Sequence, residues 1–277
     1  MSIYKHLKPS EGNKNIGKSN SNVLNVYLDN NIVVSVENGE YSLNELKTLL
    51  PNKEINLFYS AAHLYEAESF PGNLILSRET FLNRRFQTIR NLFKNNYLYL
   101  DLNGNIVRRL VEDPQNVYNT ITEIPSAITA MKGFMNFISK ELKEQIRDSL
   151  GIEVHKLNNY TEENVLEHLN AKLPGLGMDI SFMELIEMSI NCHPDGSTFG
   201  LHNRIAAIFE LLDMLGYWKD KETNTSNYAR LWDADHCFNA SYCDYFVSND
   251  KRTRNKAKVV YRIYKAETKV ISTSLNN

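Results

Sequence analysis

Two short apolar runs in the first quarter of the chain have the length and composition of buried strands. Residues 23–28 (VLNVYL) form the first, which ends at the polar residues 29–31 (DNN), and residues 55–59 (INLFY) form the second. Between the two runs, Ser42 and Glu45 stand at the spacing of a capping box, in which each side chain bonds the backbone of the other residue. This pattern predicts a short helix between two strands.

The alternation of strands and helices continues after the second run. Pro51 closes the first predicted helix, and Ser60 is placed to cap a second helix that ends at Pro71 and Gly72. Strands that alternate with helices are typical of a parallel sheet covered by helices. The predicted fold class is therefore α/β, with a three-layer parallel sheet flanked by helices.

The pattern changes twice in the middle of the chain. Helical spacing over residues 78–96 gives way to alternation over 97–110, centred on the Asn103-Gly104 dipeptide that is typical of a hairpin. From residue 112 to residue 224 the apolar spacing is mostly helical. We interpret this long stretch as a helical insertion.

The C-terminal part returns to the pattern of the beginning. Residues 227–243 have helical spacing, 245–248 (YFVS) and 269–272 (KVIS) have the pattern of strands, and 251–264 form a basic helix. The two ends of the chain are thus predicted to form two halves of one sheet. The domain prediction is a flexible arm at 1–22, an α/β domain made of 23–111 and 225–277, and a mostly helical insertion at 112–224.

Composition places the chain among ordinary globular proteins. It has 277 residues, of which 42% are hydrophobic and 23% charged, and it has no run of the about 18 apolar residues that a membrane span needs. The polar start lacks the apolar centre of a signal peptide, and the three cysteines show no CxxC spacing. We expect a cytoplasmic protein without a membrane partner, whose cysteines are small buried side chains.

Charge is unevenly distributed, although the net charge is only −2. Residues 251–277 carry eight Lys or Arg against one acid, Glu267. A basic segment of this kind is either a solvated face or a surface that follows a phosphate backbone. The charge alone does not separate these two interpretations.

Two acids follow predicted strands directly. Asp29 stands at the carboxyl end of the first strand, and Asp250 lies two residues beyond YFVS. The carboxyl ends of parallel strands open into a common crevice where ligands bind. Two carboxylates delivered to this edge would attract a divalent cation.

Two further acids lie on predicted helices. Asp233 precedes a stripe of small residues (Cys237, Ala240 and Cys243) by one helical turn, so we expect it on the packed side, whereas Asp235 points about 200° away and is expected to be exposed. Glu66 lies near the middle of the helix after the second strand. It is either an ordinary surface acid or a ligand, with Glu68 as the out-of-phase alternative.

None of the seven histidines belongs to an HxxxH or HExxH arrangement, which argues against zinc hydrolysis. His63 and His236 each lie three residues from a candidate acid. We interpret them as packing residues, with orientation of a ligand as the alternative.

Three segments of the chain resemble the acidic motifs of the PIN-domain nucleases. They are YLDNN (27–31), YSAAHLYEAE (59–68) and DADHCFNASYCDYFVSND (233–250), the last with its two terminal acids 17 residues apart. The following KRTRNKAK is similar to the basic helix that is usual in the family. The resemblance covers residues 23–75 and 228–272.

The resemblance implies both a site and an activity. The activity is metal-dependent cleavage of phosphodiester bonds, most often of RNA rather than DNA, in which carboxylate-bound cations activate water and offset phosphoryl charge. Oxygen ligands without a thiolate favour Mg²⁺ or Mn²⁺ over zinc. The implied metal ligands are Asp29, Glu66, Asp233 and Asp250, with Asn31 and Ser248 as polar neighbours and Lys251, Arg252 and Arg254 as substrate contacts.

The resemblance also suggests a biological setting. The sequence prediction is a cytoplasmic endoribonuclease that acts as a toxin or defence effector, with a protein inhibitor or antitoxin as a partner. The helical insertion would then provide the inhibitor surface or a homodimer contact. The alternative is a non-catalytic nucleic-acid-binding or regulatory module on a PIN-like scaffold.

Overall fold

The computed structural model describes residues 22–68, 77–101, 106–121, 139–177, 179–191, 200–220 and 226–273. The chain forms two compact units. The sheet unit comprises residues 1–125, 236–250 and 267–277, and the helical unit comprises 126–235 and 251–266. The predicted arm at 1–22 lies outside the described residues, apart from residue 22.

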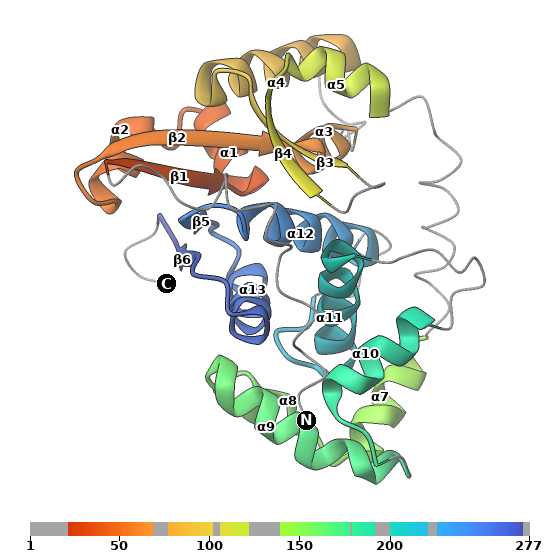
Figure 1. Ribbon diagram of the computed structural model, residues 1–277. Helices are drawn as coiled ribbons and strands as arrows, with labels where there is room; N and C mark the ends of the chain where they lie inside the picture. Colours follow the sequence, from red (N-terminus) through yellow and green to blue (C-terminus); the bar gives the residue numbers. More distant parts are fainter. Residues whose placement is uncertain are drawn as a thin grey trace. The chain divides into compact units, whose positions relative to one another are not determined.

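A six-stranded, mostly parallel sheet forms the centre of the sheet unit (Figure 1). Its strands lie in the order β4-β3-β2-β1-β5-β6, and only β3 and β4 are antiparallel neighbours. This confirms the α/β class with a sheet flanked by helices. The strands are β1 (Val23–Leu28), β2 (Glu54–Ser60), β3 (Asn96–Asp101), β4 (Ile106–Val111), β5 (Tyr245–Val247) and β6 (Lys269–Ile271).

The long-range strand pairings match the sequence predictions. β1 and β5 pair in parallel, with Leu28 beside Val247, so the two ends of the chain do share one sheet. β3 and β4 pair antiparallel, with Leu98 beside Arg109, which confirms the hairpin. Its turn residues, including Asn103 and Gly104, lie outside the described residues.

The first helix of the sheet unit was missed by the sequence analysis. We predicted that the polar residues 29–31 end the first strand and predicted no helix there, but helix α1 (Asn30–Glu37) begins directly after Asp29. The Asp29 side chain accepts a hydrogen bond from the Asn30 amide and caps this helix. The strand therefore passes into a helix within one residue.

Two other helices of this unit begin at the capping residues that the sequence predicts. Ser42 and Glu45 form the predicted capping box of α2 (Leu43–Leu49), and Ser60 caps α3 (Ala61–Ala67). Helix α3 ends at Ala67, and Pro71 and Gly72, the predicted end, lie outside the described residues. The remaining helices of the unit are α4 (Arg78–Phe93) and α5 (Pro114–Ile121).

The core of the sheet unit is apolar. Val26 and Leu28 of β1 join Phe86, Ile89 and Phe93 of α4 in one buried cluster. The period of these α4 positions brings one helix face onto the sheet, as the helical spacing of 78–96 predicts. The sheet edge that carries the polar residues is thus supported by a packed apolar layer.

The helical unit contains no strand among its described residues. Its helices are α7 (Lys140–Ser149), α8 (Val154–Leu157), α9 (Glu162–Lys172), the short 3₁₀ helix η3 (Leu173–Leu176), α10 (Phe182–Asn191), α11 (Leu201–Leu215) and α13 (Lys251–Tyr264). Helix α12 (Ser226–Ala240) contributes its first ten residues to this unit and its last five to the sheet unit. Among the described residues, no helix combines the length and apolar character needed to cross a membrane.

The grouping of elements differs from the sequence prediction at three helices, one of which is α12, whose first ten residues were assigned to the α/β domain. Helix α5 belongs to the sheet unit, although its residues were assigned to the insertion, and α13 belongs to the helical unit. Helix α13 packs there because its apolar face and buried Lys256 meet partners on other helices of that unit.

Candidate metal centre

The parallel pairing of β1 and β5 creates a polar edge in the sheet unit. Because Leu28 lies beside Val247, the next residues, Asp29 and Ser248, come together where both strands end. The Asp29 amide donates to the Val247 carbonyl at 2.8 Å, which extends the ladder by one bond. Asp29 is only 2% exposed, so its carboxylate lies inside the protein.

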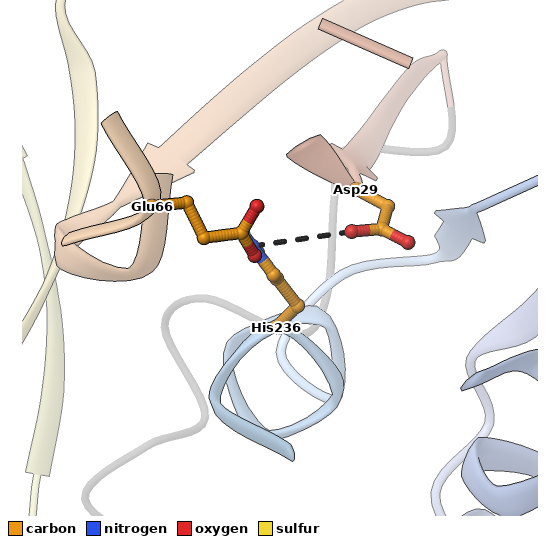
Figure 2. Close-up of side chains that lie close together, drawn as sticks. All are labelled: Asp29, Glu66 and His236. Carbon is orange, nitrogen blue, oxygen red and sulfur yellow. Dashed lines mark hydrogen bonds and ion pairs between the residues drawn. The ribbon is translucent and has the colours of Figure 1, made fainter. Parts of the chain in front are cut away.

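Three side chains from separate elements converge at this edge (Figure 2). Asp29 follows β1, Glu66 lies on α3 and His236 lies on α12, and each offers one ligand atom within 4.8 Å of the others. His236 Nε2 is 3.0 Å from Glu66 Oε1 and 3.9 Å from Asp29 Oδ1. His236 is fully buried, and Glu66 is partly open to solvent.

The second carboxylate oxygen of Asp29 is held in place. Ser248 Oγ donates to Asp29 Oδ2 at 2.5 Å, and Asn31 Nδ2 donates to the same oxygen at 2.6 Å. Asn31 also accepts a bond from the Asn249 amide, so it joins α1 to the end of β5. Asp29 Oδ1 accepts from the Asn30 amide at 2.7 Å and also faces the other two side chains.

Glu66 and His236 are held in the same manner. Asn30 Nδ2 donates to Glu66 Oε2, while Oε1 faces His236. On His236, Nδ1 bonds the Tyr27 hydroxyl at 2.8 Å, while Nε2 faces Glu66. Each of the three side chains therefore presents one atom to the centre and has the other fixed by a neighbour, which is the usual arrangement around protein metal ligands.

The centre carries two carboxylates and no paired Lys or Arg among the described residues. The Arg85 guanidinium is paired with Glu37 at 2.7 Å and reaches Glu66 only through Asn30. Burial raises the pKa of the Asp29 carboxyl, and the nearby Glu66 charge raises it further, against the opposing effects of His236 and Ser248. A cation placed among these atoms would relieve that cost.

The residues fit a single divalent cation. The separations of 3.0 and 3.9 Å from His236 Nε2 are both shorter than about 4.2 Å, twice the metal–ligand bond of about 2.1 Å. Two carboxylates and one imidazole form a mixed oxygen and nitrogen donor set. The preference for Mg²⁺ or Mn²⁺ over other ions was argued from oxygen ligands alone, so the imidazole widens the choice.

Of the four acids predicted as ligands, the structure brings Asp29 and Glu66 together in this group. Asp250 is half-buried in the sheet unit, and its amide donates to Ser248 Oγ, but it does not belong to the group of three. The strand register explains this, since it is Ser248 that lies beside Asp29. Glu68, the alternative to Glu66, bonds Arg78 and Tyr118 instead.

Asp233 is half-buried in the part of α12 that belongs to the helical unit, and it is not in the group either. The group takes its third member from His236, which the sequence analysis treated as a packing residue. One feature of the sequence could have identified His236 as a ligand: it lies one helical turn after Asp233, beside the small-residue stripe. The prediction that Asp235 is exposed is wrong: its side chain is only 15% exposed and bonds His202 at 2.5 Å.

The structure places the predicted polar neighbours at the centre, whereas the predicted substrate contacts differ in their exposure. Asn31 and Ser248 contact Asp29, as described above. Lys251 is exposed, with Nζ 5.1 Å from the centre of the Trp218 ring, and Arg252 is half-buried. Arg254 is buried, 6% exposed, so it is not placed to contact a substrate.

Comparisons of the chain with protein-family models, with curated proteins and with solved structures find no significant match.

Proposed function

We propose that the protein is a metal-dependent nuclease, an endoribonuclease on a PIN-like fold, with its metal centre at Asp29, Glu66 and His236. The observation that carries the proposal is the convergence of these three donor atoms at the carboxyl edge of a mostly parallel sheet. Ligands of α/β proteins bind at this edge. The three motifs that resemble the PIN-domain nucleases contain all three residues.

The roles of the residues follow from their contacts. Asp29 Oδ1, Glu66 Oε1 and His236 Nε2 would hold a Mg²⁺ or Mn²⁺ ion, while Ser248, Asn31, Asn30 and Tyr27 hold the opposite atoms. A bound ion of this kind activates water and offsets the negative charge of a phosphoryl group. Glu66 is the open side of the centre, since its side chain is 25% exposed. A phosphodiester would therefore approach past Glu66.

Asp233 and Asp250 stay in the proposal as acids that the family resemblance implies. Because neither belongs to the group of three, we expect their replacement by Asn to reduce cleavage less than replacement of Asp29. The assignment of RNA as the substrate rests on the same resemblance.

A cleavage assay tests the proposal. Purified protein is incubated with labelled total RNA, tRNA, single-stranded DNA and duplex DNA, first in EDTA and then with Mg²⁺ or Mn²⁺. We expect RNA cleavage only with metal, and a loss of about 100-fold or more in Asp29→Asn, the size seen when one electrostatic stabiliser is removed from an active site. Asp148→Asn, at an exposed position of α7, is the matched control and should cleave as the wild type does.

Two results would contradict the proposal. Cleavage that persists in EDTA would exclude a metal centre as the catalyst, and unchanged cleavage by Asp29→Asn would exclude this centre. RNA binding without cleavage under every condition would favour the non-catalytic module instead.

A further inference from the structure

A buried polar chain lies behind His236 in the sheet unit. Tyr27, Ser60 and His63 are at most 1% exposed, and all three carry groups that need hydrogen-bond partners. Tyr27 belongs to β1, and Ser60 and His63 lie where β2 passes into α3. The Tyr27 hydroxyl is the junction of the chain, because it contacts His236 as well as Ser60.

His63 fixes one end of this chain. Its Nδ1 accepts from the Ser60 amide at 3.1 Å, so its Nε2 carries the proton and donates to the Leu28 carbonyl at 2.9 Å. With Nδ1 accepting and Nε2 donating, the His63 ring is in its neutral form. His63 is thus held in one orientation beside Tyr27, with the two ring centroids 5.3 Å apart.

The Tyr27 hydroxyl has two close partners that can each donate or accept. Ser60 Oγ lies at 2.6 Å and His236 Nδ1 at 2.8 Å. In the neutral tautomer that carries its proton on Nε2, His236 donates to Glu66, the Tyr27 O–H donates to His236 Nδ1, and Ser60 Oγ can donate to the Tyr27 oxygen. The chain then runs from Ser60 through Tyr27 to His236.

The same atoms can be connected in the opposite direction. A metal-binding imidazole must present a lone pair, so His236 Nε2 loses its proton and Nδ1 carries it. Nδ1–H can donate to the Tyr27 oxygen, and the Tyr27 O–H can turn to Ser60 Oγ. His236 Nδ1 thus keeps the Tyr27 hydroxyl as its partner in either tautomer.

We propose that Tyr27 is the positioning residue that presents the His236 Nε2 lone pair to the centre and thereby makes it prefer a first-row transition-metal ion, represented by Mn²⁺, over Mg²⁺. This inference rests on the proposed metal centre. Two carboxylates alone suit Mg²⁺, which takes oxygen ligands and keeps several waters. An oriented imidazole adds a nitrogen ligand that transition metals accept more readily.

Titration calorimetry of the full chain with Mn²⁺ and with Mg²⁺ tests the inference. Tyr27→Phe is compared with Tyr59→Phe, which also removes a hydroxyl from a fully buried tyrosine of the same sheet, one that donates to the Glu112 carbonyl at 2.7 Å. We expect Tyr27→Phe to weaken Mn²⁺ binding about 10- to 100-fold, as loss of a partner behind a metal ligand does elsewhere. Mg²⁺ binding should weaken less, and Tyr59→Phe should bind both ions as the wild type does.

A second measurement is read on the wild type, and one variant serves only to assign the signal. Nitrogen NMR of the histidine rings, with the His236 signal identified by its absence from His236→Gln, reports which nitrogen carries the proton. Addition of diamagnetic Zn²⁺ should move the His236 proton from Nε2 to Nδ1. A proton that stays on Nε2 while the ion binds would overturn the inference.

The outcomes separate the inference from the metal centre on which it rests. Absence of binding by the wild type overturns the centre and the inference together. Binding by the wild type with equal affinities in Tyr27→Phe and Tyr59→Phe overturns the role of Tyr27 alone. Selective loss of Mn²⁺ affinity in Tyr27→Phe supports both.

Discussion

Each unit of the protein contains a buried polar cluster, and the two clusters differ in charge balance. In the sheet unit, Asp29 and Glu66 face His236 without a paired Lys or Arg among the described residues. In the helical unit, three acids are matched by three cations. These are Glu210, Asp213 and Asp220 against Lys143, Arg230 and Lys256.

The cations of this cluster are as buried as its acids. Arg230 is 2% exposed, and its Nη1 lies 3.0 Å from both Asp213 and Asp220, while Lys256 is 1% exposed and lies 3.4 Å from the same two acids. Buried charges that are fully paired and hydrogen-bonded can be tolerated in a protein interior. This cluster is therefore complete without a ligand.

The pKa values of Asp213 and Asp29 are shifted in opposite directions. Burial alone would raise the pKa of Asp213, but Lys256 and Arg230 lower it below its ordinary value. The pKa of Asp29 is raised, by burial first and then by Glu66. The contrast teaches that a buried acid paired with side-chain cations supports structure, whereas one without them is suited to an external cation.

The largest predicted effect is the difference in stability between two single variants, each with one Asp→Asn substitution in one of the clusters. Asp213→Asn leaves Arg230 and Lys256 with less compensating charge, and we expect it to lower the unfolding free energy by about 3 kcal/mol, the low end for a broken buried pair. Asp29→Asn in EDTA loses an acceptor for Ser248 and Asn31, but it also removes a charge that burial and Glu66 disfavour, so it should lower stability much less than Asp213→Asn does.

Unfolding of the two variants is measured with two different probes. Both tryptophans, Trp218 and Trp232, lie in the helical unit, so their fluorescence in urea reports on Asp213→Asn. Far-UV circular dichroism reports on both units and serves for Asp29→Asn. If Asp29→Asn destabilised the metal-free protein as much as Asp213→Asn does, the distinction between the clusters would fail.

Metal should stabilise only the cluster that lacks its own cations. At Mn²⁺ concentrations about 100 times the dissociation constant, binding to the folded state adds about 2.7 kcal/mol to the unfolding free energy. We expect this gain in the wild type and in Asp213→Asn, and its absence in Asp29→Asn. Thermal unfolding with and without EDTA measures it, and a gain that survives in Asp29→Asn would place the ion elsewhere.

The smallest effect should be an acid-induced loss in the helical unit. Because the folded pKa of Asp213 is lower than its ordinary value of 3.8, its ionised form stabilises the fold above that pH. This contribution should be constant at neutral pH and disappear as the pH falls below about 4. Tryptophan fluorescence in urea should show a steeper loss in the wild type than in Asp213→Asn, and equal slopes would remove the proposed role of the ion pairs.

Most of the sheet could be predicted from local sequence. The apolar runs at β1, β2 and β5 and the alternation around Asn103-Gly104 identified strands because buried strands need such patterns. Helix α1 was missed because 29–31 (DNN) has the composition of a loop. Asp29 can mark the end of a strand before a loop, and it can equally cap a helix. Composition does not distinguish these two roles.

The centre was predicted only in part, because its geometry depends on contacts between distant residues. The strand ends identified Asp29, but the register of β1 and β5, which places Ser248 beside it, is not written in either strand alone. The choice of His236 on α12 depends on how that helix is rotated against β1. Likewise, the charge count of 251–277 suggested a solvated or nucleic-acid-binding face. Lys256 of this segment is instead buried, and it pairs with Asp213 and Asp220, which lie about 40 residues earlier in the chain.

The most direct test of the metal centre is a crystal structure of the protein grown with Mn²⁺, with the ion located by its anomalous scattering. The account predicts one strong anomalous peak within about 2.3 Å of Asp29 Oδ1, Glu66 Oε1 and His236 Nε2. Occupancy of that position by Mn²⁺ would establish the centre on which the proposed activity depends. An anomalous map without a peak there, or with its peak on other residues, would contradict the account.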